Sequence, residues 1–160
     1  MEHDEEVKRH CATAYLEYIR ALVVRIRSLQ DEIEEKRALL EPSRSLYREA
    51  VSRSLATDAF ENGIIGLQEL IARFCVELAE YVEQQALAHE VLHSLSRAEY
   101  TAALTGYYVQ GKSWDRVCAD MDYTRDGMMK LRRRAILEVY DFMPESWRRD
   151  SIPNSDGAYR

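Results

Sequence analysis

The chain has 160 residues, 31% of them charged, with only six glycines and three prolines, a composition that favours helices in one domain or one domain plus an appendage. Its formal net charge of −6 excludes a generally basic nucleic-acid coat protein, so that any affinity for DNA must be local. Three widely spaced cysteines, a charged N-terminus and the lack of an apolar run of membrane-spanning length predict a cytoplasmic protein with reduced thiols and no membrane segment.

The first part of the chain, from about residue 4 to residue 41, predicts one long helix of a coiled coil. Its apolar residues follow the alternating spacing of four and three that defines a heptad seam, with Lys36 as the one interruption. We expect Pro42 to end the helix, because proline cannot continue a helix interior. The seam residues are Tyr15, Ile19, Leu22, Ile26, Leu29, Ile33 and Leu40.

A second long helix is predicted from Phe60, after a connector over residues 42–59 that we interpret as a hinge with partial helix. Thr57 or Asp58 can cap this helix. Two heptad helices joined by a connector predict an antiparallel hairpin, although the helices could instead pair between chains in a homodimer. The simpler interpretation of both helices is that their seams form core, and the alternative is a surface for a dedicated partner. The second seam comprises Phe60, Ile64, Leu67, Ile71, Phe74, Leu78, Tyr81, Ala88, Leu92 and Leu95, with Gln85 as a polar member.

Three shorter helices are predicted over residues 96–140. Ser96 and Glu99 have the spacing of a capping box, which predicts a helix from Arg97 to Gln110. After a Gly-Lys turn, Ser113 can cap a helix whose apolar stripe is Trp114, Val117, Cys118 and Met121. Asp122 and Tyr123 end this pattern, and Thr124 can cap a third helix with the stripe Met128, Leu131, Ala135 and Val139. About three turn residues between two helices is the length that a helix-turn-helix needs.

The third of these helices carries the positive charge. From Thr124 to Arg134 it holds Arg125, Lys130, Arg132, Arg133 and Arg134 against Asp126, a net of +4. At about 100° per residue, Asp126, Met129, Lys130 and Arg133 point away from the apolar stripe, Arg125 and Arg134 flank that face, and Arg132 lies closer to the core edge. A basic run alone is usually a solvated face. The capped helix and short turn before it favour DNA binding in the major groove.

The run from Tyr107 to Ile136 resembles the C-terminal module of small phage-encoded transcriptional regulators with a sigma-factor region-four-like helix-turn-helix, to which ArpU-type late-gene activators are related. The resemblance is carried without gaps by Tyr108, Gly111-Lys112-Ser113-Trp114, Asp115, Val117, Tyr123-Thr124 and Arg134-Ala135-Ile136. That family also has an N-terminal coiled-coil half. The resemblance implies a DNA-binding regulator that binds a −35-like element directly or acts beside a host sigma factor.

Two positions depart from the family pattern. Asp122 replaces a turn residue that is commonly glycine, although aspartate tolerates the left-handed conformation. Asp126-Gly127 replaces residues that are usually basic or β-branched; an acid there repels phosphate, and glycine costs about 1 kcal/mol of helix propensity. We expect DNA contacts from Lys112, Ser113, Thr124, Arg125, Asp126, Met129, Lys130, Arg133 and Arg134.

His89-Glu90-Val91-Leu92-His93 matches the H-E-x-x-H motif of zinc metalloproteases. The extended form of the motif is absent, which leaves Glu99 and Glu138 as candidates for a third ligand. No strands are predicted to line a protease cleft, and no other catalytic motif occurs in the chain. We therefore expect neither an enzyme nor a metal or cofactor site.

The complete prediction is an all-α protein with a coiled-coil helical hairpin over residues 1–95, a helix-turn-helix over 96–140 and a tail over 141–160. Phe142 and Trp147 can dock locally, and disorder is expected beyond Asp150. The predicted function is a sequence-specific DNA-binding regulator of a phage or mobile element, whose helical half forms a homodimer or touches RNA polymerase. The alternatives are a small-terminase-like oligomer for DNA packaging, or another interaction protein, and more remotely the metalloprotease.

Overall fold

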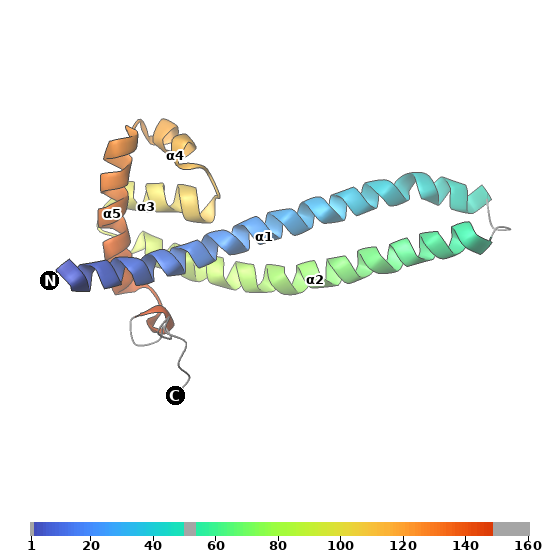
Figure 1. The fold of residues 1–160 in the computed structure, drawn as a ribbon, viewed down its shortest axis with the longest axis horizontal. Coiled ribbons are helices and arrows are strands. Elements are labelled where there is room, and N and C mark those ends of the chain that lie inside the picture. Colours follow the sequence, from blue (N-terminus) through green and yellow to red (C-terminus); the bar gives the residue numbers. More distant parts are fainter. Residues whose placement is uncertain (1, 50–53, 149–160) are drawn as a thin grey trace. The chain divides into compact units, whose positions relative to one another are not determined.

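The computed structural model describes residues 2–49 and 54–148, and all regular structure in these ranges is helical, which confirms the predicted all-α class (Figure 1). Among the described residues, no helix has both the length and the apolar character needed to cross a membrane. The helices are α1 (Glu2–Glu49), α2 (Ser54–His93), α3 (Ala98–Leu104), the π-helical turn η1 (Thr105–Val109), α4 (Trp114–Met121), α5 (Arg125–Phe142) and the 3₁₀ turn η2 (Glu145–Trp147).

The two long helices extend further than the sequence pattern predicts. The prediction that Pro42 ends the first helix is wrong, because α1 continues to Glu49. A proline inside a helix costs about 3 kcal/mol. Continuing the same helix beyond the proline avoids the separate cost of nucleating a new helix, so α1 can extend past Pro42. Similarly, α2 begins at Ser54 rather than at Phe60. Most of the predicted connector 42–59 is therefore helical, and its centre, residues 50–53, lies outside the described residues.

The chain divides into two compact units whose boundaries differ from the predicted domains. The helix-turn-helix unit comprises the residues up to Val23 and those from Glu83 onward, and the hairpin unit comprises Val24–Val82. The start of α1 and the end of α2 thus belong with α3, α4 and α5. Three short helices bury little surface by themselves, and the ends of two long helices complete their core.

Side chains from five helices form the core of the helix-turn-helix unit. The largest fully buried ones include Tyr15, Leu16 and Ile19 of α1, Leu92 of α2, Leu104, Tyr108, Met128, Val139 and Met143. Trp147 packs on this unit, with its ring centroid 5.8 Å from that of Tyr15 and 5.2 Å from that of Tyr18. Its predicted docking is thus confirmed, whereas Phe142 is 47% exposed. The predicted disorder beyond Asp150 concerns residues that the structure does not describe.

In the hairpin unit, α1 and α2 pair within one chain. Leu29 and Ile33 of α1 and Leu70 of α2 are buried together, and Leu67, Ile71 and Phe74 are packed against them. The predicted seam of α1 is buried as far as Ile33. Within the hairpin unit the predicted α2 seam, from Phe60 to Tyr81, is only half-buried, and the helix is rotated so that Leu70 lies deepest. Arg25 and Glu77 form an ion pair of 3.7 Å between the helices. At Gly63 a Cβ would lie only 2.7 Å from Leu40 Cδ2, so this glycine permits a close approach.

The predicted capping box at Ser96 is wrong. The N-cap of α3 is Arg97, without a side-chain cap, and Glu99 pairs with Arg97 instead of reaching back to Ser96. Ser96 is held by Glu138 of α5, which accepts from the Ser96 backbone N–H at 3.0 Å and from its hydroxyl at 2.7 Å. The Glu138 carboxylate, from a helix distant in sequence, therefore accepts the hydrogen bond from the Ser96 backbone N–H that the capping box predicted for Glu99. The predicted helix 97–110 is otherwise present as α3 and η1.

Candidate nucleic-acid interface

The first helix of the predicted helix-turn-helix begins and ends where the sequence pattern places it. Ser113 caps α4, and its hydroxyl accepts from the Arg116 backbone N–H at 3.2 Å. Asp122 ends the helix in the left-handed conformation, with φ 56° and ψ 47°. Aspartate tolerates this region better than most residues, so the departure from glycine preserves the turn. Gly111, with φ 69°, makes the preceding turn in a conformation that suits glycine.

The second helix of the motif follows after three residues. Thr124 caps α5, and its hydroxyl accepts from the Gly127 backbone N–H at 3.2 Å. The predicted inner stripe is confirmed, since Met128, Leu131, Ala135 and Val139 are all buried. One face of α5 is thereby fixed in the core, and the opposite face is left for solvent or a ligand.

A ladder of stacked rings and guanidinium groups supports α4 from the inside. Trp114 stacks on Tyr107 with ring centroids 4.2 Å apart and an interplanar angle of 13°. The Arg132 guanidinium lies 5.1 Å from the Trp114 ring on one side, and the Arg20 guanidinium lies 3.8 Å from the Tyr107 ring on the other. Arg132 also donates to the Tyr108 hydroxyl at 3.1 Å. Its position near the core edge agrees with the prediction from helical spacing.

Arg20 connects α1 to the turn that precedes α4. Its Nη1 donates to the carbonyl oxygen of Tyr107 and, at 3.2 Å, to that of Lys112. These two carbonyls lie in the middle of η1 and in the Gly111 turn, so a single side chain fixes the backbone that leads into α4. The orientation of the helix-turn-helix therefore depends on the N-terminal helix.

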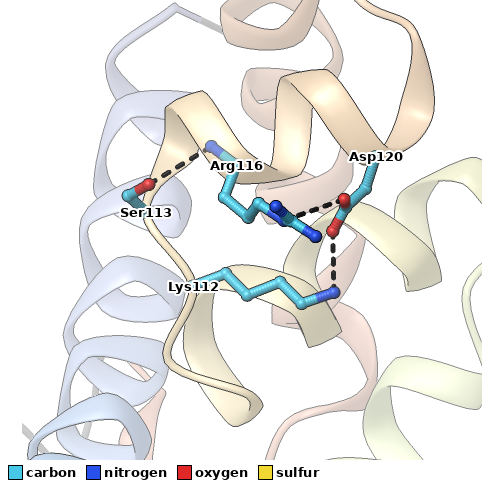
Figure 2. A network of polar contacts seen from close by, with 4 residues as sticks. All are labelled: Lys112, Ser113, Arg116 and Asp120. Atoms are coloured by element: carbon cyan, nitrogen blue, oxygen red, sulfur yellow. Dashed lines mark hydrogen bonds and ion pairs between the residues drawn. The ribbon is translucent and has the colours of Figure 1, made fainter.

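Lys112 is not free at the surface, because it belongs to an ionic network along α4 (Figure 2). Its Nζ donates to Asp120 at 2.9 Å, and Arg116 pairs with the other oxygen of the same carboxylate at 3.0 Å. The hydrogen bond from Lys112 and the two positive charges lower the pKa of Asp120 below its ordinary value of 3.8. Phosphate would have to compete with Asp120 for both cations.

Arg125, at the start of α5, is also paired. Its Nη1 donates to Asp115 of α4 at 2.7 Å, and both side chains remain largely exposed, at 69% and 79%. The pair spans the turn between the two helices and holds the guanidinium at the exposed N-terminal end of α5. Such an exposed pair contributes little stability, so the guanidinium can exchange Asp115 for another acceptor at low cost.

The outer face of α5 differs from α4 because its cations have no acidic partner. Lys130, Arg133 and Arg134 are exposed and form no ion pair within the described part of the chain. Asp126 is exposed as well. Met129 departs from the predicted outward position, since it is half-buried against the core. It lies one residue from the buried Met128, and its long, flexible side chain bends onto the apolar surface beside it.

The two imidazoles of the H-E-x-x-H sequence lie on one face of α2, with ring centroids 6.0 Å apart. They line a groove of about 690 Å³ that Lys112 and Asp120 also border. Among the described residues, no three His, Cys, Asp or Glu side chains are placed so that they could hold a metal ion. Of the two candidate third ligands, Glu138 is engaged by Ser96 and Glu99 by Arg97.

Several residues of this site give no local signal in the sequence. Arg20 lies 87 residues before its acceptor Tyr107, on a helix whose pattern indicates only a coiled coil. The acids Asp115 and Asp120 are spaced as ordinary surface residues of α4. A helical wheel predicts which way α5 faces, but it cannot predict which cations are neutralised by a neighbouring helix.

Comparison of the chain with models of known families, with curated proteins and with solved structures found no match.

Proposed function

We propose that this chain is a sequence-specific DNA-binding protein that inserts α5 into the major groove, and that it acts as a transcriptional regulator of a phage or mobile element. The observation that carries the proposal is the exposed face of α5. Its cations Lys130, Arg133 and Arg134 have no acidic partner within the described residues, while the opposite face is fixed in the core. A groove-binding helix needs both properties, because phosphate attracts free cations and base readout requires a rigid frame.

Within this proposal, Arg125 reads a base. It lies at the N-terminal end of α5, which is the part of a recognition helix that approaches base edges. Arginine can donate two hydrogen bonds to guanine, which is worth about 1–3 kcal/mol of discrimination. In the free protein the guanidinium pairs with Asp115, and it can exchange this acceptor for a base at low cost. Asp126, next in the chain, either repels phosphate or accepts from a cytosine amine.

The remaining predicted contacts position the protein on the backbone. Ser113 and Thr124 lie at helix N-termini, where unpaired backbone N–H groups favour phosphate. Lys112 reaches phosphate only by leaving Asp120. Lys130, Arg133 and Arg134 supply the salt-dependent part of the affinity. Met129, being half-buried, has at most an apolar contact to offer.

The proposal includes protein partners but no enzymatic activity and no cofactor. The resemblance to sigma region four supports direct binding of a −35-like element or action beside a host sigma factor and RNA polymerase. A homodimer formed through the helical hairpin would present two helix-turn-helix motifs to one site.

The proposal is tested by selecting bound duplexes from a random DNA pool and then measuring the affinity of variants at several salt concentrations. Arg125→Ala should weaken binding and relax the preference at one base position. Lys130→Ala and Arg133→Ala should weaken binding to all sequences and reduce the salt dependence by about one ion each. Asp126→Asn should raise non-specific affinity unless this carboxylate contacts a base. Arg37→Ala, which removes an equal charge in the hairpin unit, is the matched control and should change neither property.

Wild-type affinity in a variant that lacks Arg125, Lys130 and Arg133 together would show that α5 is not the DNA reader. An interaction protein would then be the better interpretation. A ring-shaped oligomer would favour the small-terminase-like alternative, which serves DNA packaging.

A further inference from the structure

The first helix of the helix-turn-helix motif, α4, is anchored less firmly by its own side chains than α5 is. Among its eight residues only Val117 is buried, whereas α5 buries five. Turns with left-handed residues, Gly111 and Asp122, lie on either side of α4. A helix of this length is not stable by itself in water. The position of α4 therefore depends on contacts that other elements supply.

Arg20 of α1 makes two kinds of contact with the segment that enters α4. Its Nη1 donates to the carbonyl oxygen of Tyr107 and, at 3.2 Å, to that of Lys112. Its guanidinium carbon lies 3.8 Å from the centroid of the Tyr107 ring, and this ring stacks in turn on Trp114, the first residue of α4. A planar guanidinium can stack on a ring and donate hydrogen bonds at the same time, whereas the ammonium group of lysine is a point charge. The residue type at position 20 therefore matters beyond its charge.

The stack continues from α4 to the proposed recognition helix α5. The guanidinium of Arg132 in α5 lies 5.1 Å from the Trp114 ring, and it donates to the Tyr108 hydroxyl at 3.1 Å. Arg20 and Arg132 thus form the two ends of a stack that joins α1, η1, α4 and α5. In a helix-turn-helix the first helix crosses the DNA backbone while the second enters the major groove. The angle between α4 and α5 therefore decides whether both can meet a duplex at once.

We propose that Arg20 is a positioning residue for DNA recognition, which holds α4 at its angle to α5 without contacting the duplex itself. This inference rests on the proposed function, in which α5 reads bases and the N-terminus of α4 contacts phosphate. Phosphate contacts fix the register of a protein on DNA, and base contacts require geometry within about 0.5 Å. Non-specific binding needs no fixed register. Loss of the Arg20 contacts should therefore reduce specific binding more than non-specific binding.

Two simpler roles of Arg20 lead to different expectations. A residue that only stabilises the fold would change the free energy of unfolding, but it would not change the affinity of the molecules that remain folded. A residue that contacts phosphate directly would contribute about one ion to the salt dependence of binding. A positioning residue lowers the ratio of specific to non-specific affinity and leaves the salt dependence unchanged.

The first test compares the affinity of the full chain for a duplex selected from a random pool with its affinity for an unrelated duplex of equal length. Arg20→Lys keeps the charge but removes the planar group. It should weaken specific binding about tenfold, a loss comparable to that of one base contact, and non-specific binding by less than about twofold. Circular dichroism at the assay temperature checks that the variant is folded. Arg37→Lys, the same change at an exposed arginine of the hairpin unit, is the matched control and should alter neither affinity.

The second test separates positioning from a direct phosphate contact. Arg20→Met removes the charge and the hydrogen-bond donors but keeps an unbranched apolar side chain. It should lose at least as much specific affinity as Arg20→Lys, while the slope of log affinity against log salt concentration stays at the wild-type value. A slope reduced by about one ion would show that Arg20 contacts phosphate itself, and this would overturn the inference.

The third test uses hydrogen exchange without DNA to measure whether Arg20 acts on α4. In Arg20→Lys the amides from Val117 to Met121 should exchange at least about threefold faster than in the wild type, because α4 opens locally. The amides from Leu131 to Val139 of α5 should be accelerated by a smaller factor. An equal factor in both helices would indicate a general loss of stability and would contradict a positioning role.

The outcomes for this inference and for the proposed function can be told apart. Wild-type protein that binds no duplex would remove the proposed function and, with it, this role of Arg20. Specific binding by the wild type that Arg20→Lys leaves unchanged would remove the role of Arg20 alone, and the proposed function would stand.

Discussion

The helix-turn-helix unit and the hairpin unit contain the same two long helices but bury them to different depths. Among the described residues, 21 buried side chains form one core in the helix-turn-helix unit, whereas the buried cluster of the hairpin unit has three. The heptad rhythm is similar along both parts of α1 and α2. Burial therefore depends less on the heptad spacing than on the number of helices that pack against a seam. In the helix-turn-helix unit α3 and α5 pack against the two long helices, and the hairpin unit has no such additional helices among the described residues.

Two core truncations test this difference most strongly. Leu104→Ala, at a fully buried residue of α3, should lower the free energy of unfolding by about 2–5 kcal/mol, because it leaves a cavity among neighbours that cannot collapse. Ile71→Ala, at a half-buried residue of the hairpin, should cost only about 1 kcal/mol. Chemical denaturation measures both. Equal losses would show that the hairpin seam is as well packed as the core.

The aromatic ladder gives the next largest effect, and it should be confined to the helix-turn-helix unit. Trp114→Ala removes the ring stacked between Tyr107 and Arg132 and should cost about 2 kcal/mol. Trp114→Phe keeps a ring and should recover part of this loss. The thermal midpoint and the near-ultraviolet circular dichroism report the change. A normal midpoint for Trp114→Ala would indicate that Arg20 alone holds α4 in place.

Local sequence signals predicted the helix-turn-helix unit well where the structure is set by neighbours along the chain. The caps at Ser113 and Thr124 and the left-handed Asp122 depend on interactions within four residues, and the inner stripe of α5 follows from the period of the helix. The predictions failed where a distant residue decides the outcome. Glu138, rather than Glu99, binds Ser96, and Asp120 forms an ion pair with Lys112. Pro42 lies inside α1, which continues on both sides of it.

Tyr15 provides a smaller test within the core of the helix-turn-helix unit. Its hydroxyl is buried without a hydrogen-bond partner among the described residues, and burial raises its pKa from 10.0 to about 12. Tyr15→Phe should therefore raise the free energy of unfolding by up to about 1 kcal/mol, since an unpaired buried hydroxyl is unfavourable. The pKa of Tyr15 is higher in the folded than in the unfolded chain. The free energy of unfolding of the wild type should therefore fall as the pH rises from 10.0 to about 12. Melting curves of both proteins at neutral and alkaline pH measure the difference. If the phenylalanine variant is less stable than the wild type, the Tyr15 hydroxyl must form a hydrogen bond in the folded protein.

The smallest expected effect comes from Asp120, whose pairs with Lys112 and Arg116 lie at the surface of the same unit. The Lys112 hydrogen bond and the two cations lower its pKa below 3.8 in the folded chain, so the carboxylate stabilises the fold above that pH and loses this contribution as the pH falls through the lowered pKa. Asp120→Asn should therefore be slightly less stable than the wild type at neutral pH, and the two melting temperatures should converge in acid. Added salt should shrink the difference, because exposed ion pairs are screened. Lys112→Gln should produce a similar loss, and combining it with Asp120→Asn should add little. A difference that persists unchanged in acid and in high salt would mean that Asp120 acts through packing or helix propensity rather than through its charge.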